Sequence, residues 1–306
     1  MRMAIVGLGG VGGYYGGKLA RCYSQSGAHE VIFVARGKTL QAIKAAGLKV
    51  KAQDGEFVVR PDLVSDNPQE IGKVDFVLVC TKSYGLEDSL ATYRGIFGAN
   101  TVTVSLLNGV NNDKRIAQVL GGEGFVLDGL VYINAGILEP GVISQNGPVS
   151  KLIFGTNSDL STYRPLEALM KEAGIDAHLV SDITTQVWIK YLFICPLAGI
   201  TAMRKKSLGE INSSAADRQM LEGMIKEAKA VADKQGVALP DDIVATTLKR
   251  VGDYPAAART SMQKDFEAGN KTELDVFTGY ISRAGKELRV PTPLHDEVYQ
   301  ALLNYC

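Results

Sequence analysis

The sequence predicts an α/β protein in which a doubly wound sheet is followed by an all-α domain. Three observations carry this expectation. Short β-branched runs alternate with helical patterns in the first half, a glycine-rich turn follows the first run, and the β-branched runs disappear after about residue 181. With 306 residues the chain is long enough for two domains. We place them at residues 1–180 and 181–306.

The first half shows strand–helix alternation of the kind that builds a parallel sheet. Asp54-Gly55 is a strong hairpin-turn signal between two alternating segments. We expect strands at residues 3–7, 30–34, 75–80, 101–106 and 125–132, helices at 11–25 and 38–46, and a hairpin over 48–60.

The second half has helical periodicity throughout. Pro196 and Gly199 are expected to kink the first helix, and Gly236 to end the second. The predicted helices cover residues 182–202, 215–235, 240–251, 261–267, 273–288 and 292–305.

Charge and cysteine content narrow the function classes. Lys plus Arg number 33 and Asp plus Glu number 33, so no basic surplus favours nucleic acid or a membrane surface. The chain enters an apolar run at its start and has no apolar stretch near 20 residues, so we expect no signal peptide, no membrane span and a cytoplasmic location. The four cysteines, Cys22, Cys80, Cys195 and Cys306, lack metal-ligand spacing, so we expect reduced thiols and no metal.

A dinucleotide-binding motif of the Rossmann type occupies the turn between the first strand and the first helix. Its glycines allow a tight turn and close approach to a pyrophosphate, and the helix N-terminus offers unpaired N–H groups. The bare pattern also fits a purely structural glycine turn, but its position after a strand favours the cofactor. The residues are Gly7, Leu8, Gly9, Gly10, Val11 and Gly12.

The end of the second strand indicates which dinucleotide is bound. An NAD enzyme usually has Asp or Glu here for the ribose hydroxyls. This chain has Arg36, followed by Lys38, and a guanidinium matches a 2′-phosphate in geometry and charge. NADP is therefore expected, the alternative being a solvated arginine at a strand end.

Two further residues follow strands at the same predicted edge. Lys82 could add a positive charge beside the cofactor, or be an ordinary surface lysine. Asn108 could hold the nicotinamide or the substrate, or form a turn with Gly109.

Beyond these features, the chain resembles one family across nearly its whole length. The shared motifs are the glycine turn, Val-Ala-Arg-Gly at 34–37, Cys-Thr-Lys at 80–82, Leu-Asn-Gly at 107–109, Trp-Ile-Lys at 188–190, Thr-Ser-Met at 260–262 and Lys-Thr-Glu-Leu-Asp at 271–275. In order and spacing they are similar to ketopantoate reductase (2-dehydropantoate 2-reductase).

The resemblance implies a Rossmann domain followed by a helical domain of the 6-phosphogluconate dehydrogenase type. It implies NADPH-dependent reduction of 2-dehydropantoate to (R)-pantoate, in pantothenate and coenzyme A biosynthesis. The implied roles are adenosine-phosphate binding by Arg36 and Lys82, contact with the nicotinamide end by Asn108 and the Ala135 backbone, acid catalysis by Lys190, orientation of cofactor and substrate by Glu273, and substrate binding by Asn108 and Ser261.

The residues themselves allow a consistent chemistry. Hydride attack on a ketone creates an alkoxide that needs a proton. Lys190 lies in an apolar helix pattern, where desolvation lowers a lysine's pKa, although a lysine snorkelling from a core helix has the same pattern. Glu273 could instead support a helix dipole, and Ser261 could cap a helix.

One departure from the family bears on the substrate. Ile194, Ala198 and Leu208 stand where the family typically presents asparagines to the substrate. A related NADPH-dependent reductase of a different, more apolar 2-oxo acid is therefore an alternative. A non-catalytic dinucleotide-binding sensor is another, and the retention of Lys190 and Glu273 argues against it. Exposed apolar faces on the helices would permit a homodimer.

Overall fold

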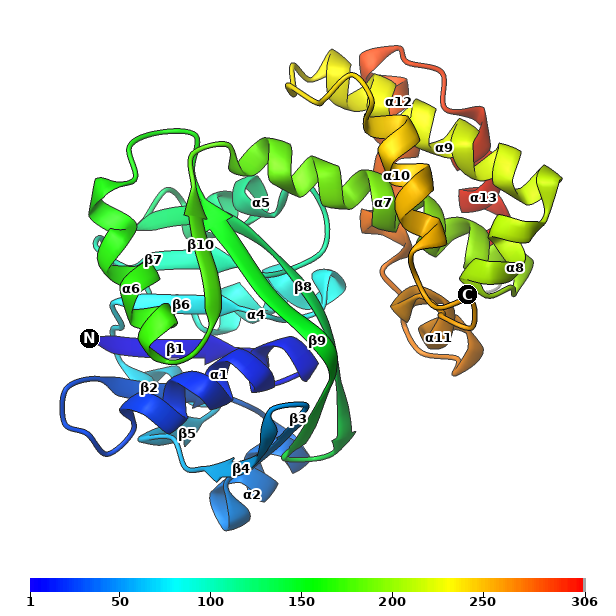
Figure 1. The fold of residues 1–306 in the computed structure, drawn as a ribbon. Helices are drawn as coiled ribbons and strands as arrows, with labels where there is room; N and C mark the ends of the chain where they lie inside the picture. Colours follow the sequence, from blue (N-terminus) through cyan, green and yellow to red (C-terminus); the bar gives the residue numbers. More distant parts are fainter. Residues whose placement is uncertain (305–306) are drawn as a thin grey trace. The chain divides into compact units, whose positions relative to one another are not determined.

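The computed structural model describes residues 1–304 and divides into two compact units, Met1–Ile183 and a second that begins at Thr184 (Figure 1). The first unit holds the sheet, and the second is helical. The α/β class with a helical C-terminal part is confirmed. Residue 305 of the last predicted helix and the thiol of residue 306 lie outside the described residues.

The first unit contains six parallel strands in the order typical of dinucleotide-binding folds. In space they run β5 (Leu63–Ser65), β2 (Glu30–Val34), β1 (Arg2–Val6), β6 (Phe76–Val79), β7 (Val102–Ser105) and β8 (Phe125–Glu139). Every neighbouring pair among them is parallel. The strand order therefore reverses at β1, the switch point outside which doubly wound sheets bind ligands.

The complete sheet is mixed rather than purely parallel, which the strand–helix alternation did not predict. The last strand, expected to end at 132, continues to Glu139 and turns into β9, so that β8 and β9 pair antiparallel. The hairpin predicted around Asp54-Gly55 is confirmed and pairs with β9. The added strands are β3 (Leu48–Ala52), β4 (Gly55–Val59), β9 (Val142–Gly155) and β10 (Asp176–Val180).

Both faces of the parallel region are buried. Along β1, Met3 and Ile5 belong to one hydrophobic cluster, whereas Ala4 and Val6 belong to another on the opposite face. The helices of this unit are α1 (Gly10–Tyr23), α2 (Gly37–Ala46), α3 (Pro68–Ile71), α4 (Leu86–Thr92), α5 (Asn112–Leu120) and α6 (Arg164–Glu172), with short 3₁₀ turns η1 (Ser83–Gly85), η2 (Arg94–Ile96) and η3 (Ser161–Tyr163).

The second unit follows the predicted helices with two differences. A short helix α8, which was not among the predicted helices, begins after a capping box formed by Ser207 and Glu210. The helix predicted over 273–288 is broken at Phe277 into a 3₁₀ turn and an α-helix. The elements are α7 (Ile183–Arg204), α8 (Leu208–Ser213), α9 (Ala215–Lys234), α10 (Ile243–Gly252), α11 (Ser261–Glu267), η4 (Leu274–Val276), α12 (Thr278–Leu288) and α13 (Pro293–Leu303).

The first helix of this unit, α7, differs from the expectation that the chain has no apolar stretch near 20 residues. Within residues 1–304, α7 is the one helix long and apolar enough to cross a membrane by length and composition, with a mean hydropathy of 1.3 over its most apolar window. The expectation of no such stretch was therefore wrong. Of that window, 67% is buried inside the structure, as in the core helix of a soluble protein.

Candidate active site

The glycine turn joins β1 to α1 through close backbone packing. Gly7 has φ +97°, a conformation that favours glycine, and a β-carbon there would lie 2.8 Å from the backbone of Cys80. A β-carbon on Gly12 would lie 2.0 Å from the carbonyl oxygen of Gly7. These two glycines are therefore required by the packing of the turn against α1 and against the end of β6.

The other two glycines of the motif face different surroundings. A β-carbon on Gly10 would lie 2.4 Å from the carbonyl oxygen of Ala135, so the extended part of β8 passes directly beside the start of α1. A β-carbon on Gly9 would meet nothing within 4 Å. Packing thus gives no reason for glycine at position 9, whereas approach of a phosphate to the backbone would.

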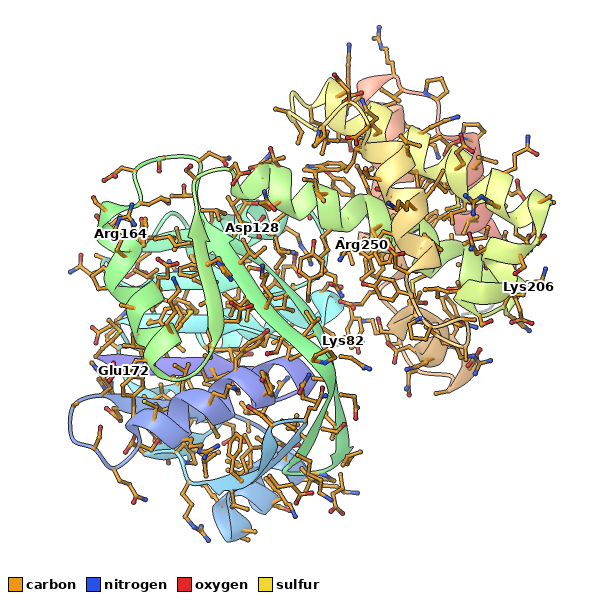
Figure 2. The ribbon with its side chains drawn as sticks, in the orientation of Figure 1. Lys82, Asp128, Arg164, Glu172, Lys206 and Arg250 are labelled. Atoms are coloured by element: carbon orange, nitrogen blue, oxygen red, sulfur yellow. The ribbon has the colours of Figure 1, made fainter. Side chains whose placement is uncertain are left out.

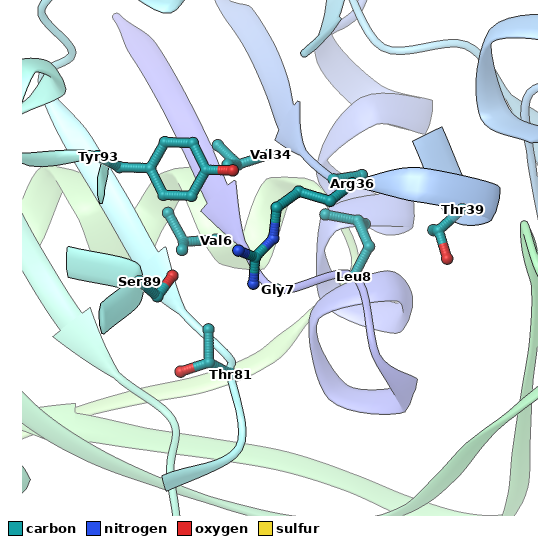
Figure 3. Close-up of a pocket in the computed structure, with 10 residues that line it drawn as sticks. Val6, Gly7, Leu8, Val34, Arg36, Thr39, Thr81, Ser89 and Tyr93 are labelled. Atoms are coloured by element: carbon teal, nitrogen blue, oxygen red, sulfur yellow. The ribbon is translucent and has the colours of Figure 1, made fainter. Parts of the chain in front are cut away.

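A pocket of about 200 Å³ opens beside this turn. Arg36 is the last residue before α2, and Figure 3 shows its guanidinium extending into the pocket among Tyr93, Ser89 and Thr81. The pocket is lined by Val6, Gly7, Leu8, Val34, Ala35, Arg36, Thr39, Thr81, Ser89 and Tyr93. One positively charged side chain in an otherwise neutral lining suits an anionic group of a ligand.

Two hydroxyl groups in the pocket lining are buried without a partner. Among residues 1–304, neither the Tyr93 hydroxyl nor the Thr81 hydroxyl has a hydrogen-bond partner. Burial raises the pKa of Tyr93, while the nearby charge of Arg36 opposes the shift. Buried polar groups are ordinarily hydrogen-bonded, so two orphaned hydroxyls in one pocket indicate a polar ligand.

The two residues expected at the edge of the sheet lie where parallel strands end. Lys82 is exposed and follows β6, next to Thr81 of the pocket (Figure 2). Asn108 follows β7 and is half-buried, and its carbonyl oxygen accepts a hydrogen bond from Asn112 at 3.1 Å. Because β1, β6 and β7 are paired in parallel, these residues and the glycine turn lie at the same carboxyl edge.

In the second unit, the helix that carries Lys190 is fixed to the segment that carries Glu273. Lys190 is half-buried on α7. The hydroxyl of its neighbour Tyr191 donates to the carbonyl oxygens of Val276 and Phe277, each at 2.8 Å. Glu273 is 6% exposed and precedes η4, with its own carbonyl accepting from the Val276 amide at 3.2 Å.

Ser261 is exposed at the first position of α11. The capping residue is Thr260, whose hydroxyl accepts from the Gln263 amide, so the interpretation of Ser261 as the helix cap was wrong. The Thr260 hydroxyl also lies 3.0 Å from the hydroxyl of Thr201 on α7, which ties the start of α11 to the lysine-bearing helix.

The three positions that depart from the family differ in exposure. Ala198 is 1% exposed and Leu208 is 4% exposed, so both belong to the core of the unit. Ile194 is half-buried on α7, one helical turn after Lys190. Of the three, Ile194 is thus the one with a side chain available to a ligand.

Several pocket residues were not predicted as site residues. The position of Thr81 could have been predicted from the sequence, because the residue closely follows a buried strand at the edge where ligands are expected. No sequence pattern identified Ser89, which lies on α4, or Tyr93, which directly follows it. Their hydroxyls reach the pocket only because of the way that helix packs.

Comparison with known proteins supports a single family. The family model described as ketopantoate reductase PanE/ApbA matches residues 3–159, and its C-terminal counterpart matches residues 182–305. YkpB of Bacillus subtilis, an uncharacterized oxidoreductase, is 29% identical in an alignment covering 100% of this chain and 99% of YkpB. The crystal structure of 2-dehydropantoate 2-reductase from Porphyromonas gingivalis is 32% identical with a TM-score of 0.87, and the match covers 99% of each chain.

The fold extends to a more distant enzyme. The ternary structure of D-mandelate dehydrogenase with NADH and anilino(oxo)acetate has a TM-score of 0.86 at 22% identity, covering 100% of this chain and 98% of that one. That likeness concerns the fold alone. Because the family models match both halves, and a relative of known structure matches the full length, the chain is an oxidoreductase that belongs to the ketopantoate reductase PanE/ApbA family.

Proposed function

We propose that this protein uses NADPH to reduce 2-dehydropantoate to (R)-pantoate, a step of pantothenate and coenzyme A biosynthesis. The observation that carries the proposal is the Arg36-lined pocket beside the glycine turn, in a chain that the family models match in both halves. Action in the cytoplasm, absence of nucleic-acid and membrane partners and an ability to form homodimers stay predictions.

The residues of the first unit fit an NADP dinucleotide. The open space at Gly9 and the N-terminal N–H groups of α1 would receive the pyrophosphate. Arg36 would bind the 2′-phosphate, since a guanidinium pairs with phosphate through two parallel hydrogen bonds. Lys82 would add a second positive charge, and the orphaned hydroxyls of Tyr93 and Thr81 would gain partners on the adenosine.

When bound, NADPH supplies the hydride, which is the chemistry that protein side chains cannot perform. The ketone oxygen gains negative charge as its carbon becomes tetrahedral. We assign to the Lys190 ammonium a hydrogen bond to that oxygen and transfer of a proton to it, which completes the alcohol. Its half-buried position on α7 limits competition from water.

Other side chains would position the reactants. The buried carboxylate of Glu273 belongs to a segment fixed to the Lys190 helix by Tyr191, so it is suited to orient the lysine and a substrate hydroxyl. The Ser261 hydroxyl, exposed at the start of α11, would bind substrate. Asn108 and the Ala135 backbone would contact the nicotinamide end and the substrate.

The test is steady-state oxidation of NADPH, followed at 340 nm, with a panel of 2-oxo acids and with NADH as the competing cofactor. Turnover of 2-dehydropantoate with the highest kcat/KM, and with NADPH preferred, is the expected result. Dinucleotide binding without turnover of any acid would contradict the proposal and indicate a sensor.

Ile194 supports a second candidate, a reductase of a more apolar 2-oxo acid. The compound 3,3-dimethyl-2-oxobutanoate differs from 2-dehydropantoate in lacking the 4-hydroxyl. A site built to hydrogen-bond a hydroxyl rejects such an analogue by about 10⁴-fold, whereas an apolar site discriminates by about 10²-fold or less. Equal or better kcat/KM for the dimethyl acid would favour the second candidate.

A further inference from the structure

We infer that the hydroxyl of Tyr93 donates a hydrogen bond to the 2′-phosphate of the dinucleotide, beside Arg36, and so contributes to a preference for NADP over NAD. The inference rests on the proposed function for the identity of the cofactor and deepens it, because it names the group that the hydroxyl recognises. Its grounds are a buried hydroxyl without a partner among residues 1–304 and a guanidinium in the lining of the same pocket (Figure 3).

The ring of Tyr93 is fixed by the hydrophobic core. Tyr93 directly follows α4, is 2% exposed and belongs to the same apolar cluster as Val6 and Val34, which also line the pocket. Its backbone amide donates to the carbonyl oxygen of Ser89 at 3.0 Å, and its carbonyl oxygen accepts from the amide of Ile96 at 2.9 Å. The hydroxyl therefore has little conformational freedom to lose when a ligand binds.

The hydroxyl is a donor, and it lies within the electrostatic influence of Arg36. Figure 3 shows it directed toward the Arg36 side chain. Burial raises the pKa of Tyr93, the charge of Arg36 opposes this shift, and the carboxylate of Asp66 reinforces it. Because the pKa stays above its ordinary value, the hydroxyl keeps its proton at neutral pH and can donate to an anion.

A charged donor and a neutral donor in one pocket favour a ligand group with several acceptor oxygens. A phosphate monoester carries three such oxygens, so it can pair with the guanidinium of Arg36 through two of them and accept from Tyr93 with the third. The ribose hydroxyl that NAD has at this position offers one uncharged oxygen. It cannot satisfy both donors, so the hydroxyl of Tyr93 adds to the affinity for the phosphorylated cofactor.

Tyr93→Phe tests the inference, because it removes the hydroxyl and leaves the ring in the core. Fluorescence titration should give a Kd for NADPH about fivefold above that of wild type, as loss of one hydrogen bond does, and a Kd for NADH within about 1.5-fold. Thr103→Val is the matched control. The Thr103 hydroxyl on β7 is also buried without a partner among residues 1–304, but it lies outside the pocket lining, so its loss should change neither Kd.

Two fragments of the cofactor repeat the comparison without the nicotinamide. Adenosine 2′,5′-bisphosphate carries the 2′-phosphate, and AMP lacks it. Calorimetric titration should show that Tyr93→Phe weakens the bisphosphate about fivefold and leaves AMP unchanged. Equal weakening of both fragments, or of NADPH and NADH, would place the hydroxyl on a group common to the two cofactors and overturn the inference.

The inference is also overturned if Tyr93→Phe changes no affinity, which would mean that the hydroxyl pairs with water alone, or if the wild-type protein does not prefer NADPH to NADH. These measurements involve no 2-oxo acid, so they are separate from the test of the proposed function. Cofactor preference that depends on Tyr93 in a protein that reduces no 2-oxo acid would support the inference and contradict the proposed function. Reduction of 2-dehydropantoate with an unchanged cofactor preference in Tyr93→Phe would do the reverse.

Discussion

Nδ1 of His295 lies 2.8 Å from a carboxylate oxygen of Glu227, in the core of the second unit. The His295 side chain is fully buried, and the Glu227 side chain is 11% exposed. The same carboxylate accepts hydrogen bonds from the backbone amides of Leu294, at 2.8 Å, and His295, at 3.0 Å. Glu227 on α9 therefore caps the start of α13 and satisfies the buried imidazole.

Removing this carboxylate should destabilise the protein without affecting its chemistry. Glu227→Ala leaves a buried ring nitrogen and two helix-terminal amides without partners, and we expect the free energy of unfolding to fall by about 2–4 kcal/mol. Glu222→Ala is the matched control on the same helix, because its exposed pair with Lys226 contributes little. Denaturant unfolding measures both variants. An equal loss of unfolding free energy in the two variants would mean that the Glu227 contacts contribute no more to stability than a surface ion pair does.

Gly10 and Gly9 should respond differently to alanine. A β-carbon on Gly10 would collide with the Ala135 carbonyl, so Gly10→Ala should lower Tm by several degrees. A β-carbon on Gly9 has open space, so Gly9→Ala should leave Tm within 2 °C or so of wild type but weaken NADPH about tenfold, by occupying the space proposed for the pyrophosphate. Thermal melts and NADPH fluorescence titrations measure the two effects. Unaltered NADPH affinity in Gly9→Ala would argue against the proposed pyrophosphate position.

Arg36 should discriminate between the two nicotinamide cofactors. Arg36→Ala removes the guanidinium proposed for the 2′-phosphate, a charge-assisted contact of about 2–3 kcal/mol, so Kd for NADPH should rise roughly 30- to 150-fold. Kd for NADH, which has no such phosphate, should change less than threefold. Equal weakening of the two cofactors would show that Arg36 does not bind the 2′-phosphate.

Removing the unpaired hydroxyl of Tyr93 should affect protein stability and NADPH affinity in opposite directions. Tyr93→Phe removes a buried hydroxyl that has no partner among residues 1–304, so the free protein should be as stable as wild type or more stable by about 1 kcal/mol. NADPH affinity should nevertheless fall by about fivefold, because the dinucleotide loses a hydrogen bond. Denaturant unfolding without NADPH measures the stability of the free protein, and unfolding with NADPH reports its affinity for the cofactor. Lower stability of the free variant would show that the hydroxyl is already satisfied.

Lys190 should affect the chemical step rather than cofactor binding. Lys190→Ala should lower kcat about 10²–10⁴-fold, as loss of a general acid does, while Kd for NADPH stays within threefold. Lys190→Arg keeps the charge but transfers a proton poorly, so it should not restore kcat. Single-turnover rates measure the effect directly. A kcat near that of wild type in either variant would remove Lys190 from the mechanism.

The glycine turn shows what sequence can predict about this site. Gly7 and Gly12 lie between a strand and a helix that are adjacent in the chain, and Arg36 follows the next strand within the same strand–helix–strand unit. Such signals act over a few residues, so the pattern alone located the turn. The break at Phe277 escaped prediction because the periodicity of 273–288 is helical, and the carbonyls of Val276 and Phe277 accept from Tyr191, which is distant in sequence.

By itself, the sequence determined the strand–helix alternation of the first half, the helical character of the second, the glycine turn and the cation at the end of β2, because turn and periodicity preferences are local. Only the tertiary structure decided that Ala135 lies against Gly10, that Tyr93 reaches the Arg36 pocket, that Ala198 is buried while Ile194 is not, and that Arg250 stacks on Phe193. These relations join residues far apart in the chain. They depend on which strands pair and how helices pack, and local preferences do not encode those contacts.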